Sequence, residues 1–160
     1  MKFYILILSI VLLSACSRES INYTNLKAQT LMHTHKQKLS KDHLSGIASL
    51  SYLNPVLDYK SKDEIFVLAL APKEFEHKKM EVFINNNKAQ ITPLEHNDEL
   101  LKYLINNEYS NYYKVSISNQ NNITLQAKVC LQDLPCFELN FQKYSKSLYY
   151  RSIELDTQYN

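Results

Sequence analysis

The sequence has a single glycine, Gly46, and no tryptophan. A phosphate-binding loop needs several glycines, because the backbone must approach the phosphate closely, so a glycine-rich nucleotide site is excluded. A Gly-x-Ser-x-Gly motif is also missing, which excludes one common arrangement of a nucleophilic serine. Basic and acidic residues number 18 and 16, and neither kind forms a long run. Nucleic-acid binding therefore lacks the cationic surface that supplies its electrostatic affinity.

Long hydrophobic runs are missing as well. The longest apolar stretch, residues 3–13, is interrupted only by Ser9. As a helix it would span roughly 16 Å, against about 30 Å for the hydrocarbon core of a bilayer. Lys2 precedes this stretch and the polar residues 17–20 follow it at once. This pattern is typical of an export signal, so we expect residues 1–15 to form a signal helix that is removed.

The signal ends in Leu13-Ser14-Ala15-Cys16. This tetrapeptide resembles the lipobox of bacterial lipoproteins, in which an aliphatic and two small residues precede the modified cysteine. The resemblance covers residues 1–16 alone. It implies a diacylglyceryl group on the Cys16 thiol, cleavage after Ala15 and acylation of the new amino terminus. An ordinary signal with an incidental cysteine is the alternative.

A lipid on Cys16 would make the bilayer the first partner of this protein. Each buried methylene contributes about 0.8 kcal/mol, so two or more acyl chains hold a protein stably. Ser17 stands where aspartate in this family implies retention in the inner membrane, so the resemblance implies the outer membrane, facing the periplasm. The inner membrane and the cell surface stay open. Residues 16–25 form the predicted lipidated tether, and no cofactor other than the lipid is expected.

Short runs with the alternation of β-strands recur through residues 26–160. The nearly continuous apolar run 64–71, stopped by Pro72, predicts a core strand that is buried on both faces or is a central strand of a sandwich. The segments 80–84 and 89–94 flank an asparagine-rich turn and predict a hairpin. With one glycine available, asparagine must supply the left-handed backbone of the turns.

The other expected elements follow from the same patterns. Residues 97–105 predict the one convincing helix, capped by Asn97 or Asp98, whereas 26–38 fits a strand or a helical face. Gly46 marks a bulge or a close approach in its strand. About eight short strands predict one all-β domain, an antiparallel sandwich with immunoglobulin-like topology and one short helix. The remaining predicted strands are 44–53, 112–118, 123–129 and 137–141, and 149–155 is either a last strand or a packed tail.

Cys130 and Cys136 remain as a pair once Cys16 carries lipid, in a compartment that favours disulfides. A structural disulfide closing the loop 131–135 would contribute about 2–2.5 kcal/mol on the chain-entropy model. The alternative is a thiol–disulfide electron carrier. The spacing resembles the cysteine hairpin in the amino-terminal domain of the membrane thiol–disulfide reductase family, and implies electron transfer to partner proteins. Asp133 in the loop disfavours a thiolate and argues for the structural role.

His33 and His35 would place two imidazoles on one side of a strand, a spacing that can bind copper or zinc. His43, His77 and His96 could complete such a site. A periplasmic metal-binding protein is therefore a further alternative, against two histidines that are merely exposed.

Acid–base catalysis is not indicated, because capping and solvation explain the pairs Asp63-Glu64 and Asp98-Glu99 better. Tyrosines concentrate in the second half of the chain, and tyrosine is favoured at protein interfaces. We therefore expect a non-enzymatic lipoprotein whose sandwich domain binds another envelope protein. The expected partner-binding residues are Tyr109, Tyr112, Tyr113, Tyr149 and Tyr150.

Overall fold

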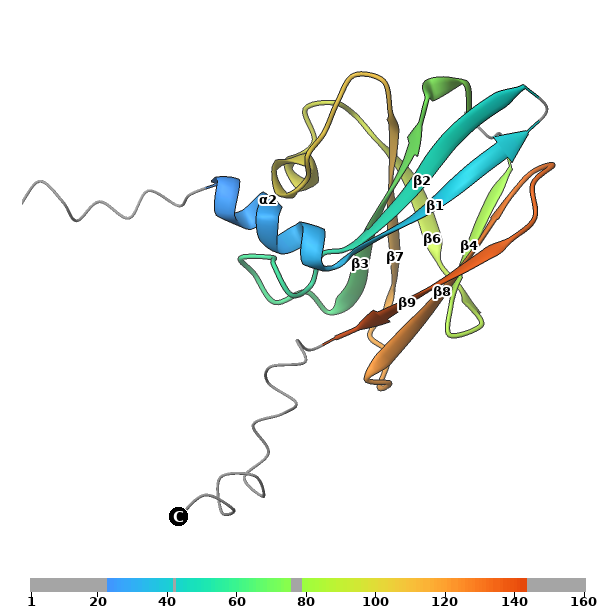
Figure 1. Ribbon diagram of the computed structural model, residues 1–160. Helices are drawn as coiled ribbons and strands as arrows, with labels where there is room; N and C mark the ends of the chain where they lie inside the picture. The colour runs from blue at the N-terminus through green and yellow to red at the C-terminus, as the bar shows by residue number, and fades with distance from the viewer. Residues whose placement is uncertain (1–22, 42, 76–78, 144–160) are drawn as a thin grey trace, which may run out of the picture.

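Two antiparallel sheets pack face to face in the computed structural model, which describes residues 23–41, 43–75 and 79–143 (Figure 1). The larger sheet has five strands in the order β1-β2-β3-β7-β6, and the smaller has four in the order β5-β4-β8-β9. The strands of the larger sheet are β1 (Thr34–Lys41), β2 (Leu44–Tyr52), β3 (Asp63–Ala71), β7 (Asn111–Ser118) and β6 (Gln90–Leu94). Those of the smaller sheet are β5 (Asn87–Lys88), β4 (Met80–Ile84), β8 (Thr124–Leu131) and β9 (Phe137–Gln142). The predicted all-β sandwich is confirmed.

The strand order is that of an immunoglobulin domain. In that fold strands A, B, E and D form one sheet and C, F and G the other. Here β2-β3-β7-β6 correspond to A-B-E-D, and β4-β8-β9 to C-F-G. The strand β1 is an addition, paired with β2 at the edge of the larger sheet. It places a further row of side chains on both faces of that sheet.

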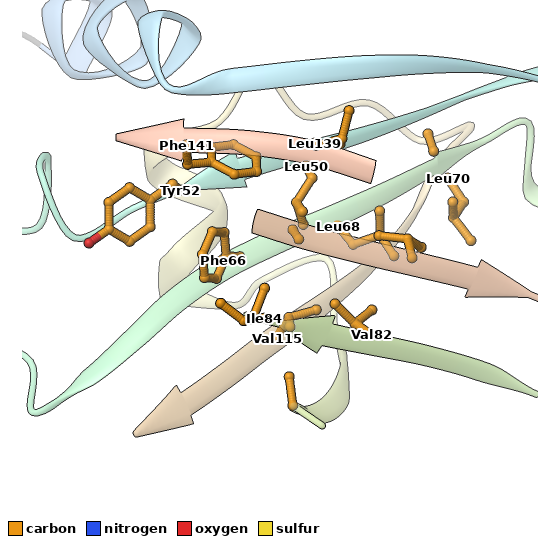
Figure 2. Close-up of a cluster of buried hydrophobic side chains, with 14 of the residues drawn as sticks. Leu50, Tyr52, Phe66, Leu68, Leu70, Val82, Ile84, Val115, Leu139 and Phe141 are labelled. Carbon is orange, nitrogen blue, oxygen red and sulfur yellow. The ribbon is translucent and has the colours of Figure 1, made fainter. Parts of the chain in front are cut away.

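The main core lies between the two sheets. The β3 strand contributes Phe66, Leu68 and Leu70 to it, and all three are fully buried (Figure 2). The alternate residues Ile65 and Val67 are also buried, but they belong to a second cluster on the outer face of the larger sheet. The prediction that residues 64–71 form a strand buried on both faces is therefore confirmed.

The second cluster exists because three segments cover part of that outer face. These are α2 (Tyr23–Met32), the loop after β2, and the 3-10 helix η3 (Glu99–Tyr103), seen beside α2 in Figure 1. Leu53, Val56 and Leu101 pack there, and Tyr103 donates a hydrogen bond from Oη to Asp58 Oδ1 at 2.8 Å. The five-stranded sheet is therefore a middle layer with apolar contacts on both faces.

Glu64 joins the two sheets at one end of the sandwich. It was expected to be solvated, but only 2 % of its surface is exposed. Its carboxylate accepts a hydrogen bond from Tyr52 Oη at 2.6 Å and pairs with Lys143 Nζ, which follows β9 in the other sheet. The sequence could not reveal this buried ion pair, because the two charges lie far apart along the chain.

The predicted hairpin of 80–84 with 89–94 is wrong. β4 pairs with β5 only at Phe83 and Ile84 and with β8 along its length, whereas β6 pairs with β7 in the opposite sheet. The asparagine turn does form, with φ of 48° at Asn85 and 67° at Asn86. After it the chain passes through the buried Ala89 and changes sheet. An alternating pattern specifies a strand, but it does not specify the neighbouring strand.

The helices also differ from expectation. The predicted helix 97–105 is instead the shorter 3-10 helix η3, with Asp98 as its N-cap, whose Oδ1 accepts a hydrogen bond from Leu100 N at 2.9 Å. The α-helix is α2, which ends at Met32, so the ambiguous segment 26–38 divides into helix and strand. It begins at Tyr23, inside the predicted tether. The other predicted strands correspond to β2, β7, β8 and β9, except 149–155, which lies outside the described residues.

Gly46 marks the predicted close approach in β2. A Cβ atom at this position would lie 2.4 Å from the Ala71 carbonyl oxygen and 2.4 Å from the Phe75 ring. Phe75 ends the 3-10 helix η2 (Lys73–Phe75) and is almost completely buried. Only glycine leaves room for this aromatic ring to close that end of the core.

Candidate functional site

A disulfide joins Cys130 and Cys136, as predicted. Their Cα atoms lie 4.2 Å apart at the tip of the β8–β9 hairpin. Cys130 is half-buried and Cys136 is exposed. The bond therefore closes the hairpin and is also accessible from solvent on one side.

Charged side chains surround this hairpin in a way that the local sequence does not show. Lys41 Nζ lies 3.1 Å from Asp133 Oδ2, which links the end of β1 to the disulfide loop. Cys130 borders a hollow lined by Lys79 and by Lys88, whose Nζ is 2.6 Å from Glu81 Oε1. The acidic loop residue is thus paired with a cation from a distant strand.

The histidines do not gather. His33 lies between α2 and β1, and burial lowers the pKa of its imidazole, which favours the neutral form. His35 on β1 packs edge-on against Phe141, with ring centroids 4.8 Å apart. His43 and His96 are exposed, and His77 lies outside the described residues. Within the described ranges, no three histidine, cysteine, aspartate or glutamate side chains stand close enough to hold a metal ion.

The tyrosines predicted to bind a partner do not form one surface. Tyr109 is 77 % exposed, but Tyr112 is only 5 % exposed and lies in the second cluster. The Tyr112 hydroxyl accepts a hydrogen bond from Asn107 N at 2.8 Å. Tyr113 is half-buried on the opposite face of β7, against the main core. Tyr149 and Tyr150 lie outside the described residues.

A groove of about 300 Å³ lies on the outer face of the larger sheet, beside the second cluster. We call it the α2 groove. One wall is formed by Lys27 and Leu31 of α2, and another by Leu104, Ile105 and Asn107, which follow η3. The floor is the outer face of β1, β2 and β3.

Small side chains line the middle of the floor of the α2 groove. Ser49 of β2 lies opposite Ala69 of β3, and Ile47 lies opposite Ala71. The Ser51 and Thr34 hydroxyls, one row away, hydrogen-bond each other at 2.8 Å. These two hydroxyls are therefore satisfied within the protein, and apart from Lys36 of β1 the floor presents apolar and neutral surface.

The rim of the α2 groove combines exposed apolar residues with cations. Leu31, Ile47 and Ile105 are 47 %, 50 % and 65 % exposed, although each is a large aliphatic side chain. Lys27 and Lys36 also line the groove, and no acidic side chain does so. Among the described residues neither lysine has an ion-pair partner. The rim is therefore suited to a ligand with apolar and anionic groups.

Sequence patterns did not reveal the α2 groove, because its lining comes from four separate stretches of the chain, within residues 27–36, 47–51, 67–71 and 104–112. The only local signal was Ile47, an aliphatic residue on the face of β2 that also carries Ser45 and Ser49, whereas the other face of the strand is apolar. The pairing of β2 with β3 is needed to bring Ser49 and Ala69 together.

Comparisons with protein-family models, curated proteins and solved structures found no match for this chain. In the part of the chain that the structure describes, no helix has the length and apolar character needed to cross a membrane.

Proposed function

We propose that this protein is a lipid-anchored envelope protein whose sandwich domain binds another envelope protein through the α2 groove. The function is non-enzymatic: the sandwich presents a surface and the lipid holds it at the membrane. The anchor rests on the signal and lipobox of residues 1–16. The chain between Cys16 and Tyr23 reaches at most about 25 Å, so α2 and the groove beside it stay near the bilayer.

The observation that carries the binding role is the exposed apolar rim. Leu31, Ile47 and Ile105 border one hollow and keep about half or more of their surfaces in water. Covering them would recover about 25 cal/mol for each Å² of apolar surface buried. Contiguous apolar surface around a concavity is typical of a protein interaction site.

A photo-cross-linking side chain at Ile47 tests this role in the native membranes. We expect a discrete cross-linked species from position 47, because the partner's surface would lie within reach of that side chain. Ile123 is the matched control, since it is also an isoleucine with 50 % exposure and lies immediately before β8 in the other sheet. Cross-linking of equal yield and pattern at both positions, or at neither, contradicts the proposal.

Thiol–disulfide exchange is a second candidate function, favoured by the exposure of Cys136 and by the pairing of Asp133 with Lys41. In such a reaction the reduced Cys130 and Cys136 thiols would pass two electrons and two protons to a partner's disulfide. That bond would break as the Cys130–Cys136 bond forms. Equilibration with dithiol redox buffers measures the reduction potential of the Cys130–Cys136 disulfide. A Cys130→Ala/Cys136→Ala variant is the control for folding. A potential below about −300 mV marks a structural bond and ends this candidacy.

A further inference from the structure

We infer that the α2 groove takes an extended peptide segment of the partner that alternates apolar and carboxylate side chains. The inference rests on the proposed function and adds the chemistry of the segment that is recognised. Three observations support it: the shape of the floor, the positive charge of the rim, and the hydrogen bond between the Thr34 and Ser51 hydroxyls, which leaves neither of them in need of a ligand.

The dimensions of the floor suit an extended chain. Its residues form three rows across the larger sheet, led on β2 by Ile47, Ser49 and Ser51. The row led by Ser51 is buried, since Ser51 and Val67 are 3 % and 1 % exposed. At about 3.3 Å per residue, the two open rows led by Ile47 and Ser49 lie about 7 Å apart, which is the distance between alternate residues of an extended chain. The floor is three strands wide, with strands about 4.8 Å apart, which leaves room for one chain and its side chains.

The periodicity of the floor also favours this ligand. Successive rows are two residues apart, which is the interval at which an extended peptide presents side chains to one face. Small side chains in the middle row, Ser49 and Ala69, give space for a larger side chain from above. The apolar rim at Leu31, Ile47 and Ile105 would then cover its aliphatic groups.

The charge of the groove selects the remaining side chains. Lys36 stands beside the middle row on β1, and Lys27 on the facing wall. With no acid in the lining, both ammonium groups are available to the carboxylates of the peptide. Such partly exposed pairs each contribute up to about fivefold in affinity, and salt weakens them.

A peptide titration on the full protein tests the inference. The probe is a five-residue peptide with blocked ends that alternates acidic residues with leucine, and its counterpart carries asparagine and glutamine in place of the acids. Binding is followed by the shifts of the Ser49 and Ala69 backbone amide signals in NMR spectra. We expect the acidic peptide to bind about fivefold to tenfold more tightly at low salt. Equal affinity overturns the inference.

Two lysines provide a matched pair of variants. Lys36 and Lys128 are both exposed strand residues without an ion-pair partner among the described residues, and Lys128 lies on β8 of the other sheet. Lys36→Glu should abolish the preference for the acidic peptide, whereas Lys128→Glu should leave it unchanged. If both variants lose the preference for the acidic peptide equally, the preference arises from the net charge of the protein and not from the groove, and the inference fails.

Two other occupants are distinguished by the same titration. If the chain's own residues 144–160 fill the groove, removing their acidic groups weakens this competitor. A Glu154→Gln/Asp156→Asn variant then binds the acidic peptide markedly more tightly than the wild-type protein, and the inference fails. If a second copy fills it, the protein dimerises and Lys36→Glu dissociates the dimer, which also overturns it. Cross-linking at Ile47 without any preference for acidic peptides would refute only the peptide chemistry and leave the proposed function standing.

Discussion

Replacing Cys16 with serine should abolish the incorporation of labelled palmitate and leave the signal uncleaved. The thiol is the only group at this position that can form the thioether to diacylglycerol, and in the lipoprotein family cleavage follows that modification. The wild-type protein should stay with membranes through an alkaline carbonate wash, because the proposed acyl chains would hold it at about 0.8 kcal/mol for each buried methylene. Labelling and intact mass report the two changes.

The matched control for Cys16→Ser is a Cys130→Ser/Cys136→Ser variant, which removes the other two cysteines of the chain. It should lose the hairpin disulfide and keep the palmitate label. A label that survives in Cys16→Ser shows that the lipid lies elsewhere. If the wild-type protein is cleaved but washes free of membranes, residues 1–15 are an ordinary export signal, and the anchor proposal fails.

Local patterns predicted the elements of this fold better than their arrangement. The run 64–71 identified β3, because a strand buried on both faces needs apolar residues at every position. The α2 helix was ambiguous, since it has no acidic residue in its first turn and no basic residue in its last. The change of sheet after Ala89 depends on which strand pairs with β4. That strand is β8, in which Val129 lies opposite Val82 and Ala127 lies opposite Ile84.

The candidate site was beyond prediction for a related reason. The α2 groove is a product of strand register, which brings Ser49 opposite Ala69. The prediction of a tyrosine surface rested only on the number of tyrosines in the second half of the chain. It missed that Tyr112 and Tyr113, as neighbours on one strand, must point to opposite faces. Cys130 and Cys136 were predictable because they are close in sequence and a hairpin brings them together.

Glu64→Gln should lower the free energy of unfolding by about 3–5 kcal/mol, because it leaves a largely buried Lys143 ammonium without its counter-charge. The Lys143 side chain is 12 % exposed and the Glu64 side chain 3 %. Lys143→Met should cost a similar amount, since the carboxylate then stays buried and keeps only its hydrogen bonds from Tyr52 Oη and Gln120 N. Denaturant unfolding followed by circular dichroism measures both changes.

The double variant separates a buried ion pair from simple packing. In Glu64→Gln/Lys143→Met neither charge is left alone, and the amide can still accept the hydrogen bond from Tyr52. Its cost should therefore be smaller than the sum of the two single costs, and no larger than either. Additive losses would mean that the two side chains stabilise the sandwich independently.

An exposed ion pair, Glu81–Lys88, serves as the reference for the free-energy cost of losing the buried pair. Lys88 Nζ lies 2.6 Å from Glu81 Oε1, but their side chains are 63 % and 51 % exposed. The variant Glu81→Gln should therefore cost no more than about 1 kcal/mol, because solvent screens the charges. If Glu64→Gln costs as little as Glu81→Gln, burial does not strengthen the link between the sheets. A large difference would identify the Glu64–Lys143 pair as the contact that fixes the end of β9 against β3.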